Sequence, residues 1–379
     1  MKSVSEEVLS LTQELLRINT INPPGQEKEC ADFLARLLES AGFEVGAYEF
    51  SAGRPSLVAR LPGRGNKLPL CYAGHIDTVS LGDSKWSRDP FAGEVDGDRL
   101  YGRGASDMKG GVAACVVSAL QMAKHPARKA DILLVIAAGE ETGCEGTAHL
   151  ASLSGVLGEA GGLVVAEPTS NNLFVAHKGA LWLELKTKGV AAHGSMPEEG
   201  VSAIYPAAKA VLKLQDIDLG YPLHPILGTA TLNVGVIAGG TKINVVPDRA
   251  LIQVDIRTVP GKTTDETISD LKNTLGQEVE INSLLGVDAV ATDPDNEWVQ
   301  EVSAILSERS EEPVLPKGLP YFTDAAVLTP AFDSVPTIIL GPGEVEMAHK
   351  TDESCSISRL SEAVEIYTEI SRRWCGVSD

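Results

Sequence analysis

The sequence "LPLCYAGHIDTV", residues 68–79, places an imidazole and a carboxylate directly after an apolar run. The run from Leu68 to Ala73 predicts a buried strand, and His75 and Asp77 follow its carboxyl end. In open α/β sheets, ligands bind beyond the carboxyl ends of the strands. Residues i and i+2 of an extended chain point to the same side, so Asp77 could hydrogen-bond the His75 ring and fix the nitrogen that faces a metal ion. A capped turn with a solvent-facing histidine is the alternative interpretation.

The first half of the chain alternates patterns that are typical of helices and of strands. We expect helices at 27–41, 110–124 and 146–153, and strands at 56–61, 68–73, 131–138 and 162–166. The alternation resumes after residue 293, through a strand in "SVPTIILGPG" and a final helix at 358–372. This order predicts an α/β fold in which a mixed sheet lies between helices.

Residues 178–292 follow a different order, which interrupts that alternation. The expected elements are a strand at 180–189, a helix at 202–214, strands at 229–238 and 250–257, a helix at 263–275 and a strand at 279–285. This β-α-β-β-α-β order is the ferredoxin-like split motif, and it is complete in itself. Because 379 residues exceed the usual span of one hydrophobic core, we expect two domains. The larger comprises 1–177 and 293–379, and the smaller, 178–292, is inserted into it.

Composition limits the classes of partner. Apolar residues make up 43% and charged residues 22% of the chain, and the formal net charge is -20. So acidic a protein argues against nucleic acid and acidic membrane surfaces as partners. The first twenty residues form an amphipathic helical pattern rather than a signal peptide, and no apolar run is long enough to cross a bilayer. Six scattered cysteines without a CxxC motif suit reduced thiols, so we expect a cytoplasmic protein.

The arrangement at His75 recurs along the chain, with acids or a histidine near the ends of predicted strands or at a helix start. These residues are Asp107 in "LYGRGASDMKGG", Glu140 and Glu141 in "DILLVIAAGEETG", Glu167 in "GGLVVAEPT" and His349 in "GEVEMAHKTDE". If the loops converge, they form a site of imidazoles and carboxylates without sulfur, which suits zinc, cobalt or manganese. One shared carboxylate would let two ions lie about 3.5–4 Å apart. A solvated acidic turn is the alternative interpretation of the glutamate pair.

The chain resembles the dinuclear zinc amidohydrolases and metallopeptidases that include acetylornithine deacetylase, succinyl-diaminopimelate desuccinylase, aminoacylase and carboxypeptidase G. The resemblance covers nearly the whole chain, in family order, through "GHIDTV", "WSRDPFAGEVDGDRLYGRGASDMKGG", "GEETGCEG", "AEPT", "HKGALWLELKTKGVAAHGSMP", "KINVVPDRALIQVDIR" and "MAHKTDE". It implies that His75, Asp107 and Glu167 hold one metal ion. By the same resemblance Asp107, Glu141 and His349 hold the second, so that Asp107 bridges the two. It also implies a cis peptide bond after Asp107.

The resemblance implies catalytic roles for three further residues. Asp77 would orient His75, and Glu140 would be the general base. Metal coordination lowers the pKa of water toward ~7, and Glu140 could accept the proton and return it to the leaving amine. His193 in "GVAAHGSMP" is the candidate for stabilising the oxyanion, because family members bring this histidine to the metals from the small domain, in dimers from the partner subunit. A loop histidine at the rim of the domain is the alternative.

Substrate recognition requires a localised cation, because an amino-acid carboxylate must bind to a strongly acidic protein. Arg257, at the end of "LIQVDIR", can bind such a carboxylate through two hydrogen bonds, with Lys178 and Asn244 as helpers. An interdomain salt bridge is the alternative for the two cations, and a turn residue is the alternative for Asn244. The loop 319–328, "LPYFTDAAVL", is expected to cover the acyl or side-chain end of the substrate. It departs from the glycine- and serine-rich form expected of desuccinylases.

Three functions follow from these residues. The first is metal-dependent hydrolysis of the amide bond of an N-acyl amino acid, with acetylornithine-like substrates preferred and zinc as the expected metal. The second is a carboxypeptidase, dipeptidase or aminopeptidase reaction on the same site. The third is a protein that binds metal and amino-acid derivatives without turnover, against which Glu140 argues, because no ligand role requires it. We expect a homodimer in which 178–292 serves both for dimerisation and as a lid.

Overall fold

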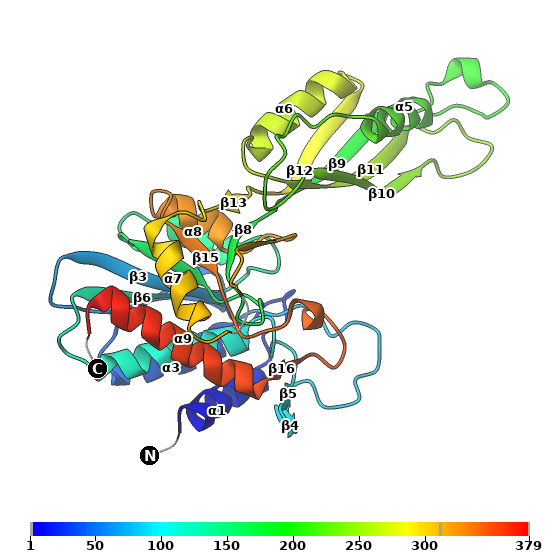
Figure 1. The fold of residues 1–379 in the computed structure, drawn as a ribbon. Helices are drawn as coiled ribbons and strands as arrows, with labels where there is room; N and C mark the ends of the chain where they lie inside the picture. The colour runs from blue at the N-terminus through cyan, green and yellow to red at the C-terminus, as the bar shows by residue number, and fades with distance from the viewer. Residues whose placement is uncertain (1–2, 311–312, 378–379) are drawn as a thin grey trace. The chain divides into compact units, whose positions relative to one another are not determined.

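The computed structural model describes residues 3–310 and 313–377, whose helices and strands are drawn in Figure 1. The chain divides into two compact units. The larger unit takes the described residues of Met1–Val175, Thr292–Lys317 and Thr323–Asp379, and the smaller takes Ala176–Ala291 and Gly318–Phe322. The sequence-based larger domain also includes 1–2, 311–312 and 378–379, which lie outside the described residues.

A mixed sheet forms the centre of the larger unit, in the order β1-β2-β6-β3-β7-β15-β8-β13, with β14 paired to β8. Strands β6, β3, β7 and β15 run parallel to one another, whereas the pairs β1-β2, β2-β6, β15-β8 and β8-β13 are antiparallel. The strands are β1 (Glu44–Ser51), β2 (Arg54–Leu61), β3 (Lys67–His75), β6 (Ala130–Ala137), β7 (Gly162–Val165), β8 (Phe174–His177), β13 (Val290–Ala291), β14 (Lys317–Leu319) and β15 (Thr337–Ile339). The predicted mixed sheet is confirmed.

Helices of the larger unit pack on this sheet and on one another. Helices α1, α3 and α9 contact one another, α3 and α9 pack on β3 and β6, and α2 and α4 pack on β1 and β2. The Tyr72 hydroxyl of β3 donates a hydrogen bond to the Tyr367 carbonyl of α9 over 2.8 Å. The helices are α1 (Val4–Arg17), α2 (Lys28–Ser40), α3 (Lys109–Ala123), α4 (Glu145–Ser152), α7 (Glu297–Ser307), α8 (Ala325–Ala331) and α9 (Ile357–Cys375).

Helix α3 approaches the sheet closely at its N-terminal end. A Cβ atom at Gly111 would overlap the Ala166 carbonyl oxygen, which directly follows β7. Only glycine therefore allows the start of α3 and the end of β7 to meet at this distance. The consequence is that the loop before α3 and the loop after β7 lie side by side, and each of these loops carries a predicted ligand.

A second, small sheet in the larger unit has the order β16-β5-β4. Its strands are β4 (Glu94–Asp96), β5 (Arg99–Tyr101) and β16 (Ser354–Ser356), and β16 pairs antiparallel with β5. Ser354 lies opposite Tyr101 in this register. Strand β5 thus leads into the segment that carries Asp107, while the segment that carries His349 leads into β16. The pairing aligns two regions that are about 250 residues apart.

The smaller unit is an antiparallel sheet in the order β10-β11-β9-β12 with two helices. Leu181, Leu183 and Leu185 alternate on β9 toward a core shared with both helices. The elements are β9 (Gly179–Lys188), α5 (Ile204–Gln215), β10 (Thr231–Gly239), β11 (Arg249–Thr258), α6 (Thr264–Leu275) and β12 (Val279–Val287), with a short 3₁₀ turn at Pro197–Glu199. The chain has the β-α-β-β-α-β order that the sequence pattern predicts.

Sequence reasoning missed several strands of the larger unit, of which β1 is the longest. The residues of β1 are exposed or half-buried, and none is buried. The strand therefore lacks the apolar run that marks a buried strand. Strands β4, β5, β13, β14 and β16 have only two or three residues each, which is too short for a periodic pattern. Within the described ranges, every helix is too short or too polar to span a bilayer.

Candidate active site

The ends of three neighbouring parallel strands bring the predicted ligands together. His75 is the last residue of β3, Glu140 and Glu141 follow β6, and Glu167 follows β7. Strand β3 lies between β6 and β7 in the sheet and runs parallel to both. Because the carboxyl ends of parallel strands meet at one edge, the four side chains converge there.

Distances from the His75 ring define the centre of this group. Its Nε2 atom lies 3.2 Å from Asp107 Oδ1, 3.8 Å from Glu167 Oε1 and 3.9 Å from Glu140 Oε2. Atoms of His75, Asp107 and Glu141 lie within 4.8 Å of one another, as do atoms of His75, Glu140 and Glu167. Each of these triads has the donor atoms and spacing to hold a metal ion.

Asp107 faces two histidines with its two carboxylate oxygens. Oδ1 lies 3.2 Å from His75 Nε2, and Oδ2 lies 3.3 Å from His349 Nε2. His349 Nε2 is also 3.0 Å from Glu141 Oε2. The His75 side chain is 1% exposed and that of His349 is 54% exposed, so one half of the centre is enclosed and the other is open to solvent. The Asp107–Met108 peptide bond is cis, as the resemblance implied.

Asp77 contacts its neighbours in a way that the sequence did not suggest. Its backbone carbonyl oxygen lies 2.9 Å from His75 Nδ1, whereas its carboxylate is 3.5 Å from that nitrogen. The carboxylate instead accepts hydrogen bonds from the backbone N–H groups of Glu140 (3.1 Å) and Glu141 (3.2 Å). The Asn22 side chain donates a third hydrogen bond, over 2.9 Å. The Asp77 side chain therefore holds the turn that carries both glutamates.

Buried acids lie close together in this centre, which favours a bound cation. Burial raises the pKa values of Glu140 and Glu167 well above the usual range, and burial together with Asp107 raises that of Glu141. Within the described chain, the buried Glu141 Oε1 atom has no hydrogen-bond partner. Oxygen and imidazole donors in this number, with one carboxylate oxygen orphaned, fit divalent metal ions.

The smaller unit carries the other predicted residues, in two pairs. Gly194 N donates to the Asn244 carbonyl over 2.9 Å, and His193 forms an isolated bridge with Val245, so His193 and Asn244 lie on adjacent segments. His193 is exposed, and its Nδ1 atom is 2.6 Å from Ser195 Oγ.

Lys178 and Arg257 form the second pair. Burial lowers the pKa of the Lys178 ammonium, and the nearby Arg257 lowers it further. Lys178 Nζ donates to the Thr229 carbonyl over 2.6 Å, and Arg257 Nε lies 3.1 Å from Asp255 Oδ1. Two cations are thus held close together on the smaller unit.

Comparison with protein families identifies the group to which these residues belong. The family model described as peptidase family M20/M25/M40 matches residues 71–373. The chain belongs to this family. It is therefore a hydrolase of the amidohydrolase and peptidase type, and membership of the family implies divalent metal ions as cofactors.

Curated M20 relatives match over nearly the full length. A protein of Staphylococcus epidermidis, called probable succinyl-diaminopimelate desuccinylase, is 30% identical over 403 residues, which cover 97% of this chain and 98% of the relative. The acetylornithine deacetylase of Myxococcus xanthus is 31% identical over 362 residues, which cover 91% of this chain and 92% of the relative. The expected resemblance to this group is confirmed.

Solved M20 structures share the fold. An M20 family metallo-carboxypeptidase from Sulfolobus solfataricus is 19% identical with a TM-score of 0.80, covering 98% of this chain and 100% of that one. The aminopeptidase PepT from Bacillus cereus is 21% identical with a TM-score of 0.76, and the alignment covers 98% of both chains. At these identities the likeness shows the fold alone.

Sequence reasoning missed three polar residues around this M20 centre. Asn22 binds Asp77, and Glu353 accepts hydrogen bonds from the segment that leads to Asp107. Asp324 is buried, its Oδ1 accepts a hydrogen bond from Thr147 Oγ1 over 2.5 Å, and burial raises its pKa to about 6. The only signal for these residues is position, because Glu353 ends "MAHKTDE" and Asp324 lies in the loop 319–328.

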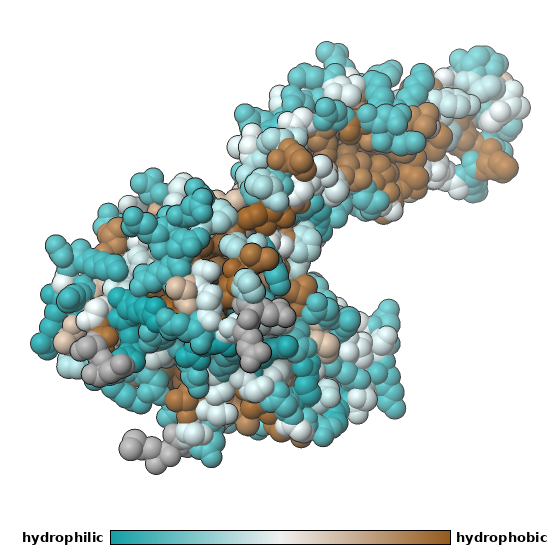
Figure 2. Space-filling view, viewed as in Figure 1, coloured by the Kyte–Doolittle hydropathy of each residue, from teal (hydrophilic) through white to brown (hydrophobic). Residues whose placement is uncertain are grey.

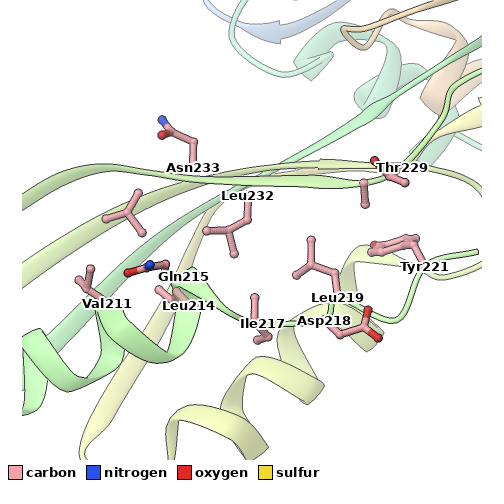
Figure 3. Close-up of a pocket in the computed structure, with 12 residues that line it drawn as sticks. Val211, Leu214, Gln215, Ile217, Asp218, Leu219, Tyr221, Thr229, Leu232 and Asn233 are labelled. Atoms are coloured by element: carbon pink, nitrogen blue, oxygen red, sulfur yellow. The ribbon is translucent and has the colours of Figure 1, made fainter. Parts of the chain in front are cut away.

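The smaller unit also holds a surface pocket, which Thr229, the hydrogen-bond partner of Lys178, helps to line (Figure 3). Its volume is about 520 Å³, and Figure 3 shows side chains of α5, the following loop and β10 pointing into it. Leu214, Ile217, Leu219 and Leu232 supply apolar walls. None of the residues predicted to bind metal or substrate lines this pocket, so it is not the candidate active site.

Removing the metal ions should make the stability of the M20 centre depend on pH. Hydrogen bonds with Asp107 and Glu141 raise the pKa of His349 to about 10 in the metal-free chain. The folded chain then holds a proton that the unfolded chain releases above a pH of about 6.5, so this contribution to stability is lost as the pH rises toward 10. In EDTA, the melting temperature should fall between pH 7 and pH 9.

Thermal denaturation in EDTA and in saturating zinc would measure this effect. The zinc-loaded protein is the control. Its melting temperature should change less between pH 7 and pH 9, because metal ions then occupy the positions of the protons. A melting temperature in EDTA that stays constant or rises between pH 7 and pH 9 would contradict the expectation.

Proposed function

We propose that the protein hydrolyses the amide bond of an N-acyl amino acid with the help of two divalent metal ions, most simply zinc. The observation that carries the proposal is the group of two imidazoles and four carboxylates around Asp107, in which Glu140 lies beside the ligand atoms. The full-length relatives named deacetylase and desuccinylase support an acyl group on an amino-acid nitrogen. Acetylornithine-like substrates remain our first expectation, and a succinyl group is the second.

The proposed ligand sets are those that the family resemblance implies: His75, Asp107 and Glu167 for one ion, and Asp107, Glu141 and His349 for the other. The distances are compatible with them, because His75 Nε2 lies 3.2 Å from Asp107 and 3.8 Å from Glu167, and His349 Nε2 lies 3.3 Å from Asp107 and 3.0 Å from Glu141. Bound ions of this kind lower the pKa of water and polarise a carbonyl oxygen.

Glu140 is assigned the proton transfers. Glu140 is 5% exposed, and burial raises its pKa well above the usual value, which makes its carboxylate a stronger base. In the proposed reaction it accepts a proton from the attacking water and returns it to the nitrogen of the leaving amine. The Asp77 carboxylate fixes the position of Glu140 through the backbone N–H group, so that the base faces the same place in both steps.

Residues of the smaller unit are assigned to substrate. The Arg257 guanidinium and the Lys178 ammonium would bind the carboxylate of the amino acid, with Asn244 as a further donor. His193 would stabilise the oxyanion. A carboxylate-binding pair suits an N-acyl amino acid and also the carboxyl end of a peptide, so carboxypeptidase or dipeptidase activity is the second candidate. It would use the same metal ligands and the same base.

The smaller unit is also the proposed dimer surface. Strand β10 is an edge strand of its sheet, and Tyr205, Leu212, Val236 and Ile237 on α5 and β10 are exposed. Figure 2 shows apolar residues gathered on the surface of this unit. An exposed edge strand beside apolar side chains is suited to pairing with a second copy of the chain. We therefore propose a homodimer formed through this surface.

The function is tested by incubating zinc-loaded and cobalt-loaded protein with a panel of N-acyl amino acids and dipeptides and detecting the freed amine. Release from N-acetyl or N-succinyl amino acids at a higher kcat/KM than from dipeptides supports the proposal. Faster release from dipeptides supports the peptidase instead, and metal binding without release from any member of the panel would overturn both.

Two variants of adjacent residues separate proton transfer from metal binding. Glu140→Ala should lower kcat by at least ~10²-fold and keep both metal ions, because the assigned role is general base catalysis. Glu141→Ala should lose one ion, because its carboxylate is a proposed ligand. Elemental analysis and kinetics on the two purified proteins provide the comparison. Two ions bound to Glu141→Ala protein, or activity of Glu140→Ala within about tenfold of wild type, would reverse the assignments.

Mixing two inactive variants tests whether His193 acts across the dimer. His193→Ala and Glu140→Ala each remove one proposed function, and a mixed dimer would contain one intact site if His193 comes from the partner subunit. Partial activity should then return after subunit exchange. Each variant incubated alone is the control. If no activity returns after verified subunit exchange, the site is completed within one chain. A protein that sediments as a monomer at micromolar concentration would contradict the proposed dimer.

A further inference from the structure

The Glu353 carboxylate is fully buried and accepts four hydrogen bonds from one segment of the chain. Oε1 accepts from the backbone N–H groups of Ser106 (2.8 Å) and Asp107 (2.9 Å). Oε2 accepts from the backbone N–H group of Gly104 (2.9 Å) and from Arg103 Nη1 (2.7 Å). Glu353 itself is 0% exposed. One side chain thus binds the Arg103 guanidinium and the backbone N–H groups of Gly104, Ser106 and Asp107.

Glu353 also belongs to the segment that carries the second histidine. It lies four residues after His349 and directly before β16. Its own carbonyl oxygen accepts a hydrogen bond from Gly102 N over 2.9 Å. The Ser106 hydroxyl donates to the Ser354 carbonyl over 2.9 Å, which adds a further connection between the same two segments. The loop of Asp107 and the loop of His349 are therefore joined through Glu353 and its neighbour.

We propose that Glu353 is a positioning residue for the dinuclear metal centre: it sets the backbone of Asp107 so that the two carboxylate oxygens face His75 and His349 at the same time. The proposal rests on the proposed function for the identity of the metal ligands. Its side-chain partners are donors of the Arg103–Asp107 segment, so Glu353 acts through Asp107 rather than on a metal ion or substrate.

The effect should reach both metal ions. Asp107 is the one proposed ligand shared by the two sets, because Oδ1 faces His75 and Oδ2 faces His349. A rotation or shift of its backbone would move both oxygens together. Loss of a residue that orients a ligand typically weakens metal binding by about 10–100-fold. A substitution at Glu353 should therefore lower the affinity for both metal ions. Glu141→Ala should instead lose one ion.

A purely structural role would give a different result. A buried Glu353–Arg103 ion pair could stabilise the fold without affecting the metal centre. In that case a variant would melt at a lower temperature but would bind metal normally while folded. Glu344 supplies the matched control, because its carboxylate, 16% exposed, binds Arg99 at 2.6 and 2.9 Å and also pairs with Arg359. It lies in the same region of the chain, and these partners are outside the Arg103–Asp107 segment.

The experiment compares Glu353→Gln, Glu353→Asp and Glu344→Gln with the wild-type chain. The amide in Glu353→Gln keeps the size of the side chain but replaces one acceptor oxygen with a donor that faces backbone N–H groups. Glu353→Asp keeps the charge, is shorter by one methylene, and serves as the second variant if the first does not fold. Metal-free proteins are titrated with Co²⁺ alone, and binding is followed by calorimetry and by visible absorption, below the melting temperature of each.

We expect Glu353→Gln to bind both Co²⁺ ions about 10–100-fold more weakly and to change the absorption spectrum of the cobalt-loaded protein, with a smaller effect in Glu353→Asp. Glu344→Gln should keep both affinities within about twofold, even if its melting temperature falls. Unchanged Co²⁺ affinities in a folded Glu353 variant would overturn the proposal, as would an equal loss of affinity in Glu344→Gln or the loss of one ion only.

The titration uses no substrate, so its result is independent of the proposed reaction. A wild-type protein that binds two ions but releases no amine from the panel overturns the proposed function and leaves the role of Glu353 to be decided by the titration. A wild-type protein that binds fewer than two ions overturns the positioning role, because Asp107 would then serve one ion at most.

Discussion

The larger unit depends on holding several acids within a few ångströms of one another, although their charges repel. Burial raises the pKa values of Glu140 and Glu167 well above normal, which measures how unfavourable the charged forms are without a cation. Parallel pairing of β6, β3 and β7 places three of the loops at one edge of the sheet. The sheet alone does not fix the side chains, because the acids and His349 lie in irregular segments outside the strands. A further set of interactions has to hold those segments.

Two buried carboxylates that are not themselves proposed metal ligands supply that set. The Asp77 carboxylate accepts hydrogen bonds from the backbone N–H groups of Glu140 and Glu141. The Glu353 carboxylate accepts hydrogen bonds from the backbone N–H groups of the segment that ends at Asp107. A carboxylate that accepts several N–H groups is stabilised in its charged form and gives each of them a fixed direction. The acidic loops are thus ordered by further buried acids, although burial raises the pKa of Glu353 to about 7 in spite of these hydrogen bonds.

The sequence predicted the parts of this arrangement that are local. Strands β3, β6 and β7 are apolar runs, and a polar residue at the end of such a run is visible without a structure, so His75, Glu140 and Glu167 could be singled out together. Glu353 could not, because its hydrogen-bond partners are 246–250 residues away and its place at the end of "MAHKTDE" does not reveal them. Asn22 is similar, since it reaches Asp77 from 55 residues away. Long-range hydrogen bonds of single side chains leave no periodic trace in a sequence.

The two units differ in how firmly they hold their polar residues, and this difference bears on specificity. His75, Asp107, Glu140 and Glu167 in the larger unit are buried. Arg257 in the smaller unit is 27% exposed and already paired with Asp255, which also accepts a hydrogen bond from Trp182 Nε1 over 3.0 Å. Under the proposed function, a substrate carboxylate must compete with Asp255 for the guanidinium. Because exposed ion pairs contribute about 0–1 kcal/mol, we expect a carboxylate that binds Arg257 and Lys178 together to displace Asp255 more readily than a neutral amide does.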